Sequence, residues 1–225
     1  MNPSYAYCAL IDVLGYKQRL KEDQDRGEFT FKDDLEVALR CLDSVNSAVF
    51  NVQAISDTIV ITCTSHGLLV EFLGVLKEVF LGFLQRGLYV RGGVAYSKHF
   101  HSNRLTYSHA IARAYELESG SAIYPRIVVD KNIVEMDAGP SSQQNLKGSG
   151  ILSVQNGLYF VNVIDVGNFK EVYSSARDLY VRDANALVGK EAPFGKHVWF
   201  ETYLREYYRS VGVEFEGYTD QIRAY

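Results

Sequence analysis

Apolar and polar residues follow two different spacings along the chain, and each spacing predicts one kind of element. Unbroken apolar or β-branched runs predict buried strands at residues 5–12, 48–55, 58–63, 88–96, 126–130 and 157–163. Apolar residues at i, i+3 and i+4 predict helices, most clearly at 67–86 before Gly87 and also at 33–42 and 108–118. Residues 16–26 are polar and charged, which predicts a surface helix that ends near Gly27.

The order of these elements predicts the fold class. Ser56 and Asp57 form a tight turn between two strands, so a hairpin stands between two crossover connections. Such an arrangement predicts an α+β sandwich, in which helices cover a mostly antiparallel sheet. We expect one catalytic domain over residues 1–165. A helical extension over 166–225, with two helical stretches separated by Pro193, is expected to pack on it.

Composition narrows the classes of partner. The chain has 225 residues, of which 47% are hydrophobic and 22% are charged, as expected for a globular protein with a core. A net charge of -4 gives no overall basic field, which argues against a nucleic-acid partner but leaves room for a local phosphate pocket. The residues around Asp137–Gln144 predict an exposed loop.

Cysteine usage and hydropathy predict a cytoplasmic protein without a membrane partner. Cys8, Cys41 and Cys63 are odd in number and lack CxxC spacing, which indicates reduced thiols. No signal peptide is evident at the start of the sequence, and no apolar run approaches the span of a bilayer.

The stretch Ala9–Lys17 holds the first candidate for chemistry. An apolar run ends in the carboxylate of Asp12, and a turn containing Gly15 leads at once into a polar helix. A bound cation offsets the cost of desolvating such an acid. An aspartate at a strand end is also common as a cap or turn residue, and both interpretations stay open at this point.

A second acid and a cation extend this candidate. Asp57 lies at the hairpin tip, and in a sheet whose first strand neighbours that hairpin both acids can point at one spot. Two carboxylates with backbone carbonyls suit a hard divalent ion. Arg91 lies in a strand otherwise free of charge, where a guanidinium suits a polyphosphate. Arg91 could equally be a structural ion-pair partner.

The start of the polar helix offers a place for phosphate oxygens. The amides of Leu14, Gly15 and Tyr16 come before or within its first turn, where backbone N–H groups are free of helical partners. Together with the helix dipole they could hold the oxygens of a triphosphate.

Three ordered motifs resemble those of the class III nucleotidyl cyclases. They are Asp12-Val13-Leu14-Gly15-Tyr16, Ile55-Ser56-Asp57-Thr58 and Val90-Arg91-Gly92-Gly93-Val94, within a match that spans roughly residues 5–165. The resemblance implies an enzyme that converts a nucleoside triphosphate into a 3′,5′-cyclic nucleotide and pyrophosphate.

The same resemblance assigns roles to individual residues. It implies that Asp12 and Asp57, with the backbone carbonyl of Val13, bind two divalent cations, Mg²⁺ or Mn²⁺. It also implies that Arg91 contacts the terminal phosphates and that the enzyme is a homodimer with shared active sites.

The sequence departs from the family pattern at four places. Ala112 and Glu116 stand where the family has an Asn and, four residues later, an Arg that stabilises the transition state. Gln53 and Leu105 stand where a Lys and an Asp usually read a purine edge. The base-reading part of the site is therefore expected to differ from that of a purine cyclase.

These departures are similar to the divergent pyrimidine cyclases of bacterial Pycsar anti-phage systems. Segments 90–96, 114–118, 124–128 and 196–200 look typical of that subgroup. The resemblance implies production of cyclic UMP, or less so cyclic CMP, as a second messenger read by a separate effector protein.

Several residues are candidates for the functions that the departures leave open. Phe50 and Gln53 could read a small base by stacking and amide hydrogen bonds, although Gln53 could instead face solvent. Arg104 and Arg113 could supply the missing transition-state charge. The histidines at 99, 101 and 109 are further candidates for that charge, and each of these groups could also be an ordinary surface residue.

Three other functions compete with a pyrimidine cyclase. The first is a purine cyclase with unusual base contacts. The second is a degenerate domain that binds a nucleotide as a sensor, which loss of the Asn/Arg pair favours and retention of both acids disfavours. The third is a palm-type polymerase or diguanylate synthase, but residues 54–57 do not form the Gly-Gly-acidic motif of the latter. The negative net charge also argues against a template-bound polymerase.

Overall fold

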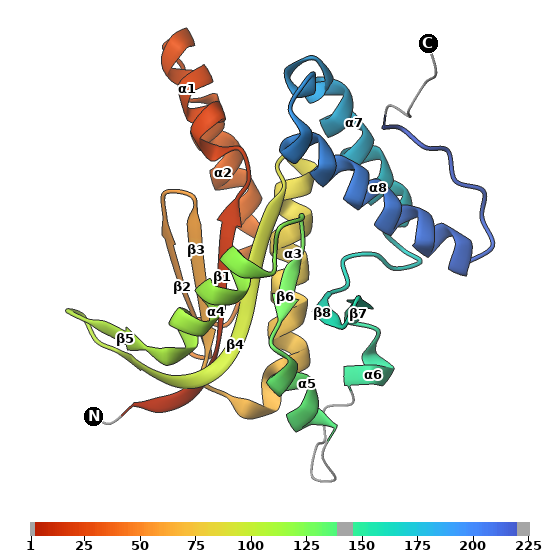
Figure 1. The fold of residues 1–225 in the computed structure, drawn as a ribbon. Helices are drawn as coiled ribbons and strands as arrows, with labels where there is room; N and C mark the ends of the chain where they lie inside the picture. Colours follow the sequence, from red (N-terminus) through yellow and green to blue (C-terminus); the bar gives the residue numbers. More distant parts are fainter. Residues whose placement is uncertain (1–2, 139–145, 220–225) are drawn as a thin grey trace. The chain divides into compact units, whose positions relative to one another are not determined.

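The computed structural model describes residues 3–138 and 146–219 (Figure 1). It divides into two compact units, Met1–Val163 and Ile164–Tyr225, each of which is treated separately below. The strands of the first unit are β1 (Ser4–Val13), β2 (Phe50–Ile55), β3 (Thr58–Cys63), β4 (Val90–His101), β5 (Thr106–Ser108), β6 (Ile127–Val129), β7 (Leu152–Gln155) and β8 (Leu158–Val161). Its helices are α1 (Tyr16–Arg26), α2 (Thr30–Leu39), α3 (Leu69–Gln85), α4 (His109–Gly120), α5 (Lys131–Asp137) and α6 (Leu146–Ser149), with short 3₁₀ turns at Arg40–Leu42 and His66–Leu68.

One sheet organises the first unit. The strands lie in the order β2-β3-β1-β4-β6-β8-β7, and β5 pairs with the far end of β4. All described pairings are antiparallel except that between β4 and β6. With helices packed on it, this mostly antiparallel sheet confirms the predicted α+β fold class.

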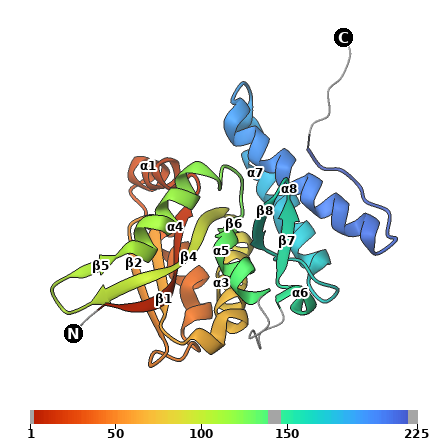
Figure 2. The ribbon, with the colours of Figure 1, turned by 60° about the horizontal axis from the view of Figure 1, so that its bottom comes forward.

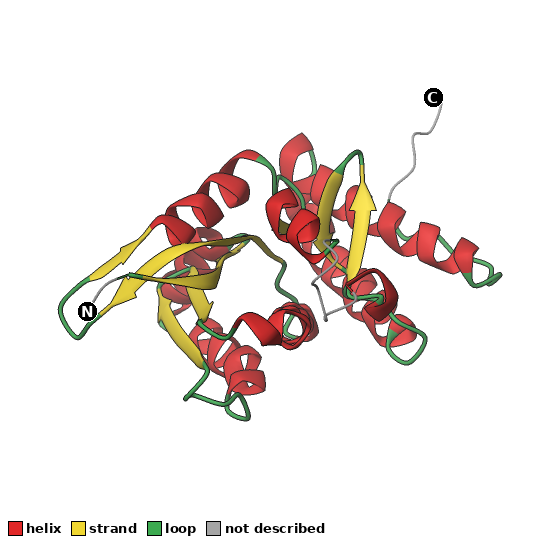
Figure 3. Ribbon diagram, turned by 90° about the horizontal axis from the view of Figure 1, so that it is seen from below, coloured by secondary structure: helices red, strands yellow, loops and turns green. Residues whose placement is uncertain are grey.

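Alternation along β1 divides the core between the two faces of the sheet. The ring of Tyr7 packs on Phe72 of α3, whereas Ala6, Cys8 and Leu10 cluster with residues of α4. Successive side chains of a strand point to opposite faces, so α3 and α4 cover opposite sides of the central strands. Figures 1 and 2 show this arrangement, and Figure 3 shows it from below.

A glycine in β4 lets α4 lie directly on the sheet. A Cβ at Gly93 would come within 2.1 Å of the Ala114 carbonyl oxygen and 2.8 Å of the Leu117 Cβ. No side chain fits in that space, so the helix backbone approaches the strand more closely than any other residue would allow.

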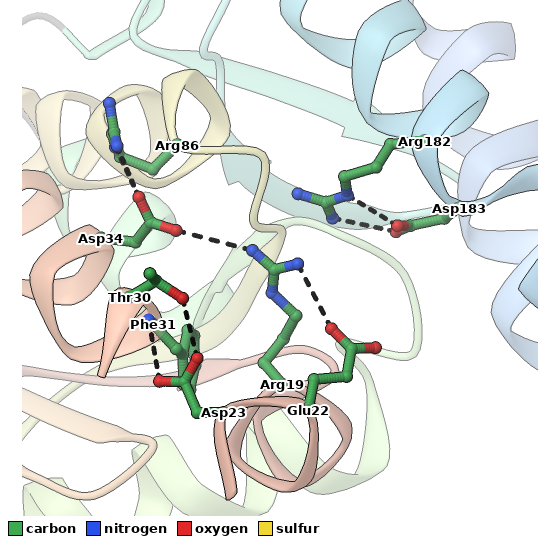
Figure 4. A network of polar contacts seen from close by, with 9 residues as sticks. All are labelled: Arg19, Glu22, Asp23, Thr30, Phe31, Asp34, Arg86, Arg182 and Asp183. Carbon is green, nitrogen blue, oxygen red and sulfur yellow. Dashed lines mark hydrogen bonds and ion pairs between the residues drawn. The ribbon is translucent and has the colours of Figure 1, made fainter. Parts of the chain in front are cut away.

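A polar network ties α1 and α2 to the end of α3 (Figure 4). The buried carboxylate of Asp23 accepts hydrogen bonds from the Thr30 hydroxyl at 2.8 Å and from the Phe31 amide at 2.9 Å, which fixes the start of α2. Asp34 of α2 lies between Arg19 of α1, at 3.5 Å, and Arg86, whose Nε is at 3.0 Å. The first turns of α1 are thereby held against the other two helices.

The predicted elements of the first unit are present, and a few short ones were missed. The strand predicted at 58–63 coincides with β3, and the helix predicted at 67–86 is α3 with its preceding 3₁₀ turn. β4 continues to His101 and pairs with β5, and these two strands with the turn between them form a hairpin, here called the β4–β5 arm. The sequence did not predict α5, α6 or β7, and residues 139–144 of the predicted loop lie outside the described residues.

The second unit contains α7 (Phe169–Leu187) and α8 (Glu191–Ser210), and one prediction about it was wrong. Pro193 does not separate the two helices but lies in the first turn of α8. Amides in a first turn have no helical acceptor, so proline is tolerated there. The chain turns instead at Gly189, whose φ of +71° suits glycine.

A buried acid and histidine organise the interior of this unit. The carboxylate of Glu201 accepts a hydrogen bond from the Tyr218 amide at 3.1 Å, which holds the segment after α8. Burial lowers the pKa of His197 to about 4, so its ring is neutral near pH 7. Within α7, Arg182 Nε donates to Asp183 at 2.8 Å (Figure 4). Among the described helices, none has the length and apolarity needed to cross a bilayer.

Candidate functional site

The structure brings Asp12 and Asp57 onto adjoining backbones. The register of β1 and β3 places Asp12 opposite Thr58, the residue after Asp57. One position further, the Val13 amide donates to the Asp57 carbonyl at 3.0 Å. The N–H and C=O of a strand residue point to the same side, so the Val13 carbonyl also faces the hairpin turn.

The hairpin turn itself adopts an uncommon conformation. Ser56 has a positive φ of +60°, which is uncommon outside glycine, asparagine and aspartate. This conformation closes the two-residue turn between β2 and β3 and leaves Asp57 beside the end of β1.

Arg91 lies beside Asp12, and its charge is shared between two acids. Its Nε donates to Asp12 Oδ2 at 3.2 Å, and its Nη2 is 2.6 Å from Oε1 of Glu118 on α4. The side chains of Asp12 and Arg91 are about one quarter exposed, whereas that of Glu118 is 5% exposed. We call Asp12, Asp57, Arg91 and Glu118 the acidic end of the sheet.

Sequence reasoning missed Glu118, although a signal for it was present. In α4 the residues Ala110, Ala114 and Leu117 are buried, and Glu118 falls on the same helical stripe. Burial raises the pKa of Glu118, the neighbouring charge of Arg91 opposes that rise, and Asp12 adds to it. Because Glu118 stands among the apolar residues on one stripe of α4, the sequence already indicated that its carboxylate is buried and needs a partner.

The turn between β1 and α1 corrects one predicted contact. The Leu14 amide donates to the Tyr89 carbonyl at 2.8 Å, continuing the β1–β4 ladder, so it is not free to hold a phosphate oxygen. Gly15 has φ of +80° and caps α1, and its carbonyl accepts from the amides of Gln18 and Arg19. The amides of Gly15 and Tyr16 thus remain as the candidates for a phosphate, while the Tyr16 ring packs edge-on against Phe31.

The donor set of the acidic end fits a hard cation but does not enclose one. Within residues 3–138 and 146–219, no group of three or more His, Cys, Asp or Glu side chains is placed to hold a metal ion. Asp12, Asp57 and the Val13 carbonyl offer oxygen donors only, which Mg²⁺ and Mn²⁺ accept. The remaining ligands would have to come from water or from the oxygens of a bound phosphate.

A second feature lies towards the other end of β3. A cavity of approximately 250 Å³ opens between the strands and the β4–β5 arm. Its lining includes Phe50, Asn51, Thr62, Thr64, His99 and His101. We call this cavity, together with Gln53 beside it, the arm end of the sheet.

The two residues predicted to read a base lie on opposite faces of the sheet, three positions apart on β2. Phe50 lines the cavity, but it is buried and its ring stacks on Phe72 of α3 with 6.3 Å between ring centroids, so that ring is not open to stack on a base. Gln53 directs its amide nitrogen to His101 Nδ1 at 3.5 Å, and that ring nitrogen is 2.8 Å from the Thr106 hydroxyl. Gln53 is therefore in contact with the arm rather than simply turned to solvent.

The lining of the cavity at the arm end includes no Asp, Glu, Lys or Arg among the described residues. Burial, and secondarily the nearby His101, lowers the pKa of His99, whose Nδ1 is 2.9 Å from the Ser108 hydroxyl. Burial also raises the pKa of the adjacent Cys8 thiol to about 12. Hydroxyl, amide, imidazole and aromatic groups line this cavity, in contrast to the acidic end.

The candidates for transition-state charge are dispersed. Arg113 of α4 is paired with Asp130 at 2.7 Å and with Glu116 at 2.9 Å. Arg104 is exposed at the tip of the arm, where its amide donates to the Ser102 hydroxyl. His109 Nε2 is 3.1 Å from the Tyr107 hydroxyl. The contacts of these groups lie within the β4–β5 arm or around α4 and Asp130.

Comparison with known proteins gives fold similarities only. No protein-family model matches this sequence, and a search among curated proteins finds no match. A bacterial light-regulated adenylyl cyclase superposes with a TM-score of 0.49 at 14% identity, covering 80% of this chain and 59% of that one.

Two fungal domains give similar values. The guanylyl cyclase domain of the RhoGC fusion protein from Blastocladiella emersonii gives a TM-score of 0.45 at 10% identity, covering 72% of this chain and 98% of that one. The guanylate cyclase domain of RhGC from Catenaria anguillulae, solved with GTP, gives 0.46 at 10% identity over 72% and 98% of the two chains. Scores below 0.5 at such identities do not establish a common family.

Proposed function

We propose that this chain is a nucleotidyl cyclase of class III type, which converts a nucleoside triphosphate to its 3′,5′-cyclic form and pyrophosphate. One observation carries the proposal. Asp12 at a strand end and Asp57 at a hairpin tip lie on backbones joined by the Val13–Asp57 hydrogen bond, beside the start of α1 and beside Arg91. Acids, helix amides and a guanidinium at one sheet end suit a metal-bound triphosphate.

The residues of the acidic end take distinct parts in this reaction. Asp12, Asp57 and the Val13 carbonyl hold two divalent cations, Mg²⁺ or Mn²⁺. When bound, these ions lower the pKa of the ribose 3′-hydroxyl and neutralise the leaving pyrophosphate. The amides of Gly15 and Tyr16 and the guanidinium of Arg91 orient the phosphates, so that the 3′-oxygen bonds to the α-phosphorus as the α–β anhydride breaks. The hydroxyl proton leaves to solvent.

We propose a pyrimidine triphosphate as substrate, UTP before CTP. The arm end offers hydroxyl, amide and imidazole groups that donate or accept hydrogen bonds, and its cavity of approximately 250 Å³ is smaller than most ligand pockets. Such a cavity suits a single small base. The Lys and Asp expected of a purine reader are replaced by Gln53 and Leu105, which removes that donor and acceptor.

The two ends of the sheet are far apart within one chain. A strand rises about 3.3 Å per residue, so Thr62 of the cavity lies about 13 Å along β3 from Thr58, which faces Asp12. A homodimer with shared active sites, in which one subunit supplies the metal-binding acids and the other the base contacts, would join them. The cyclic product would then act as a second messenger on a separate effector in anti-phage defence.

The direct test is the metal dependence of pyrophosphate release. We expect release from UTP with Mn²⁺ to be lost in Asp57→Ala and retained in Asp43→Ala, a control at an acid outside the site. Metal-dependent release that survives in Asp57→Ala would contradict the proposal. Equal release from ATP or GTP would support a purine cyclase instead.

A nucleotide sensor is the second candidate, and one observation favours it. Ala112 and Glu116 lie on α4 where the family carries the transition-state Asn and Arg, and Glu116 is paired with Arg113. A sensor would bind the triphosphate with Mn²⁺ and leave it unchanged. Equilibrium binding measured beside product formation separates the two functions.

A further inference from the structure

Glu118 takes one of the two nitrogens with which Arg91 could hold Asp12. An arginine commonly grips one carboxylate with Nε and one terminal nitrogen, which form two parallel hydrogen bonds. Here the Nε of Arg91 donates to Asp12, whereas its Nη2 is 2.6 Å from Glu118. Of the two nitrogens that could hold Asp12 side-on, Nε therefore donates to Asp12, whereas Nη2 forms an ion pair with Glu118.

The position of Glu118 is built into the fold. Glu118 is 4% exposed and lies on the helix that packs against Gly93. Gly93 follows Arg91 by two positions on the same face of β4, so the strand face that carries the guanidinium is also the face that accepts α4. The buried carboxylate of Glu118 therefore cannot reach solvent or a ligand, whereas that of Asp12 is partly exposed.

A cation that binds Asp12 must compete with Arg91 for the same carboxylate. A guanidinium that grips Asp12 with two hydrogen bonds would neutralise it and occupy both of its oxygens. Arg91 is also paired with the buried acid Glu118. When the guanidinium leaves Asp12, it therefore still has a negative partner and is not left unpaired.

We propose that Glu118 is a positioning residue, which draws Arg91 away from Asp12 so that Asp12 can bind a divalent cation. The inference rests on the proposed function, because it takes Asp12 as a metal ligand. Arg91, still held by Glu118, then lies beside the ion and is directed at the phosphates rather than at the carboxylate.

The test measures Mn²⁺ binding by the intact protein without nucleotide. The electron paramagnetic resonance signal of the free ion reports how much Mn²⁺ remains unbound. Glu118→Gln keeps the shape of the side chain and removes its charge. We expect it to weaken Mn²⁺ binding about tenfold, the scale of one charge-assisted hydrogen bond. Glu116→Gln, which removes an exposed charge paired with an arginine on the same helix, should leave binding unchanged.

A double-mutant cycle separates positioning from a simple loss of negative charge. In an Arg91→Gln background the competitor is absent, so adding Glu118→Gln should no longer weaken Mn²⁺ binding. An equal loss in both backgrounds would overturn the proposal and leave Glu118 as a distant charge. If Glu118→Gln alone fails to fold, a loss of Mn²⁺ binding on adding Glu118→Gln to Arg91→Gln still overturns the proposal, because no competing guanidinium is then present.

The outcomes distinguish this inference from the proposed function. Binding that is lost in Asp12→Asn but unchanged in Glu118→Gln overturns only the role of Glu118. Mn²⁺ binding that does not depend on Asp12 overturns both proposals.

Discussion

The acidic end and the arm end of the sheet are built from the same strands but differ in chemistry. At the acidic end Arg91 is shared by Asp12 and Glu118, beside the first turn of α1. At the arm end the cavity lining has no acid, lysine or arginine among the described residues, and Gln53 contacts His101. In the proposed enzyme, charge at one end handles the phosphates, and hydroxyl, amide and imidazole groups at the other read the base.

The comparison teaches that, in the proposed enzyme, phosphate handling and base reading can change separately. Asp12, Asp57 and Arg91 lie in the motifs that resemble those of the class III cyclases, whereas Gln53 and Leu105 depart from the family pattern. Because the ends lie about 13 Å apart along β3, a substitution at one leaves the other intact. The predictions below are chosen to separate the two ends.

The largest expected effect is at the acidic end. Asp57→Asn removes one charge without changing shape and should lower kcat about 10²–10³-fold, as for loss of a group that stabilises the transition state. Unfolding in urea should be little altered, because Asp57 lies in an accessible hairpin turn. A variant with wild-type kcat would remove Asp57 from the site.

The next effect concerns the contact that holds the acidic end together. Gly93→Ala places a Cβ 2.1 Å from the Ala114 carbonyl, so α4 must move and the protein should lose about 3 kcal/mol of stability. Gly74→Ala in α3 is the matched control, because its Cβ meets nothing within 4 Å. That control should be neutral or slightly stabilising. Urea midpoints measure both.

A smaller effect is expected at the arm end. Thr62→Val removes a hydroxyl from the cavity and should raise the KM for UTP about tenfold, the scale of one hydrogen bond to a base. Mn²⁺ binding without nucleotide should be the same as in the wild type. Equal effects on both quantities would mean that the two ends do not act separately.

The smallest predicted effect is a pH dependence of stability. The pKa of His99 is lowered in the folded state, so the unfolded chain binds more protons below pH 6.5 and stability is lost as the pH falls. His99→Gln should reduce this loss as the pH falls below about 6.5, the ordinary pKa of histidine. His197, whose pKa is lowered to about 4, contributes a similar slope from the second unit, so the comparison is best made in a His197→Gln background.

The fold could be predicted from sequence wherever an element was long and strongly periodic. The 58–63 strand and the 67–86 helix had apolar patterns that left few alternatives. The elements that the sequence did not predict, α5, α6 and β7, are too short to show a clear period, and their presence depends on tertiary contacts. Pro193 was misjudged because its cost depends on its position within a helix, which periodicity does not give.

The candidate site could be predicted only in part. The strand end at Asp12 and the hairpin tip at Asp57 were visible in the sequence, and the β1–β3 register brings them together. The engagement of the Leu14 amide by Tyr89 depends on the length of the β1–β4 ladder. The place of Glu118 depends on the close packing at Gly93, a contact between residues distant in sequence.

The most direct test of the central claim is product identity with each of the four ribonucleoside triphosphates in the presence of Mn²⁺. The purified chain should release pyrophosphate and a 3′,5′-cyclic pyrimidine nucleotide, from UTP before CTP, and Asp12→Asn should abolish both products. Absence of any cyclic nucleotide from all four triphosphates, under conditions where the protein is folded and binds Mn²⁺, would contradict the claim.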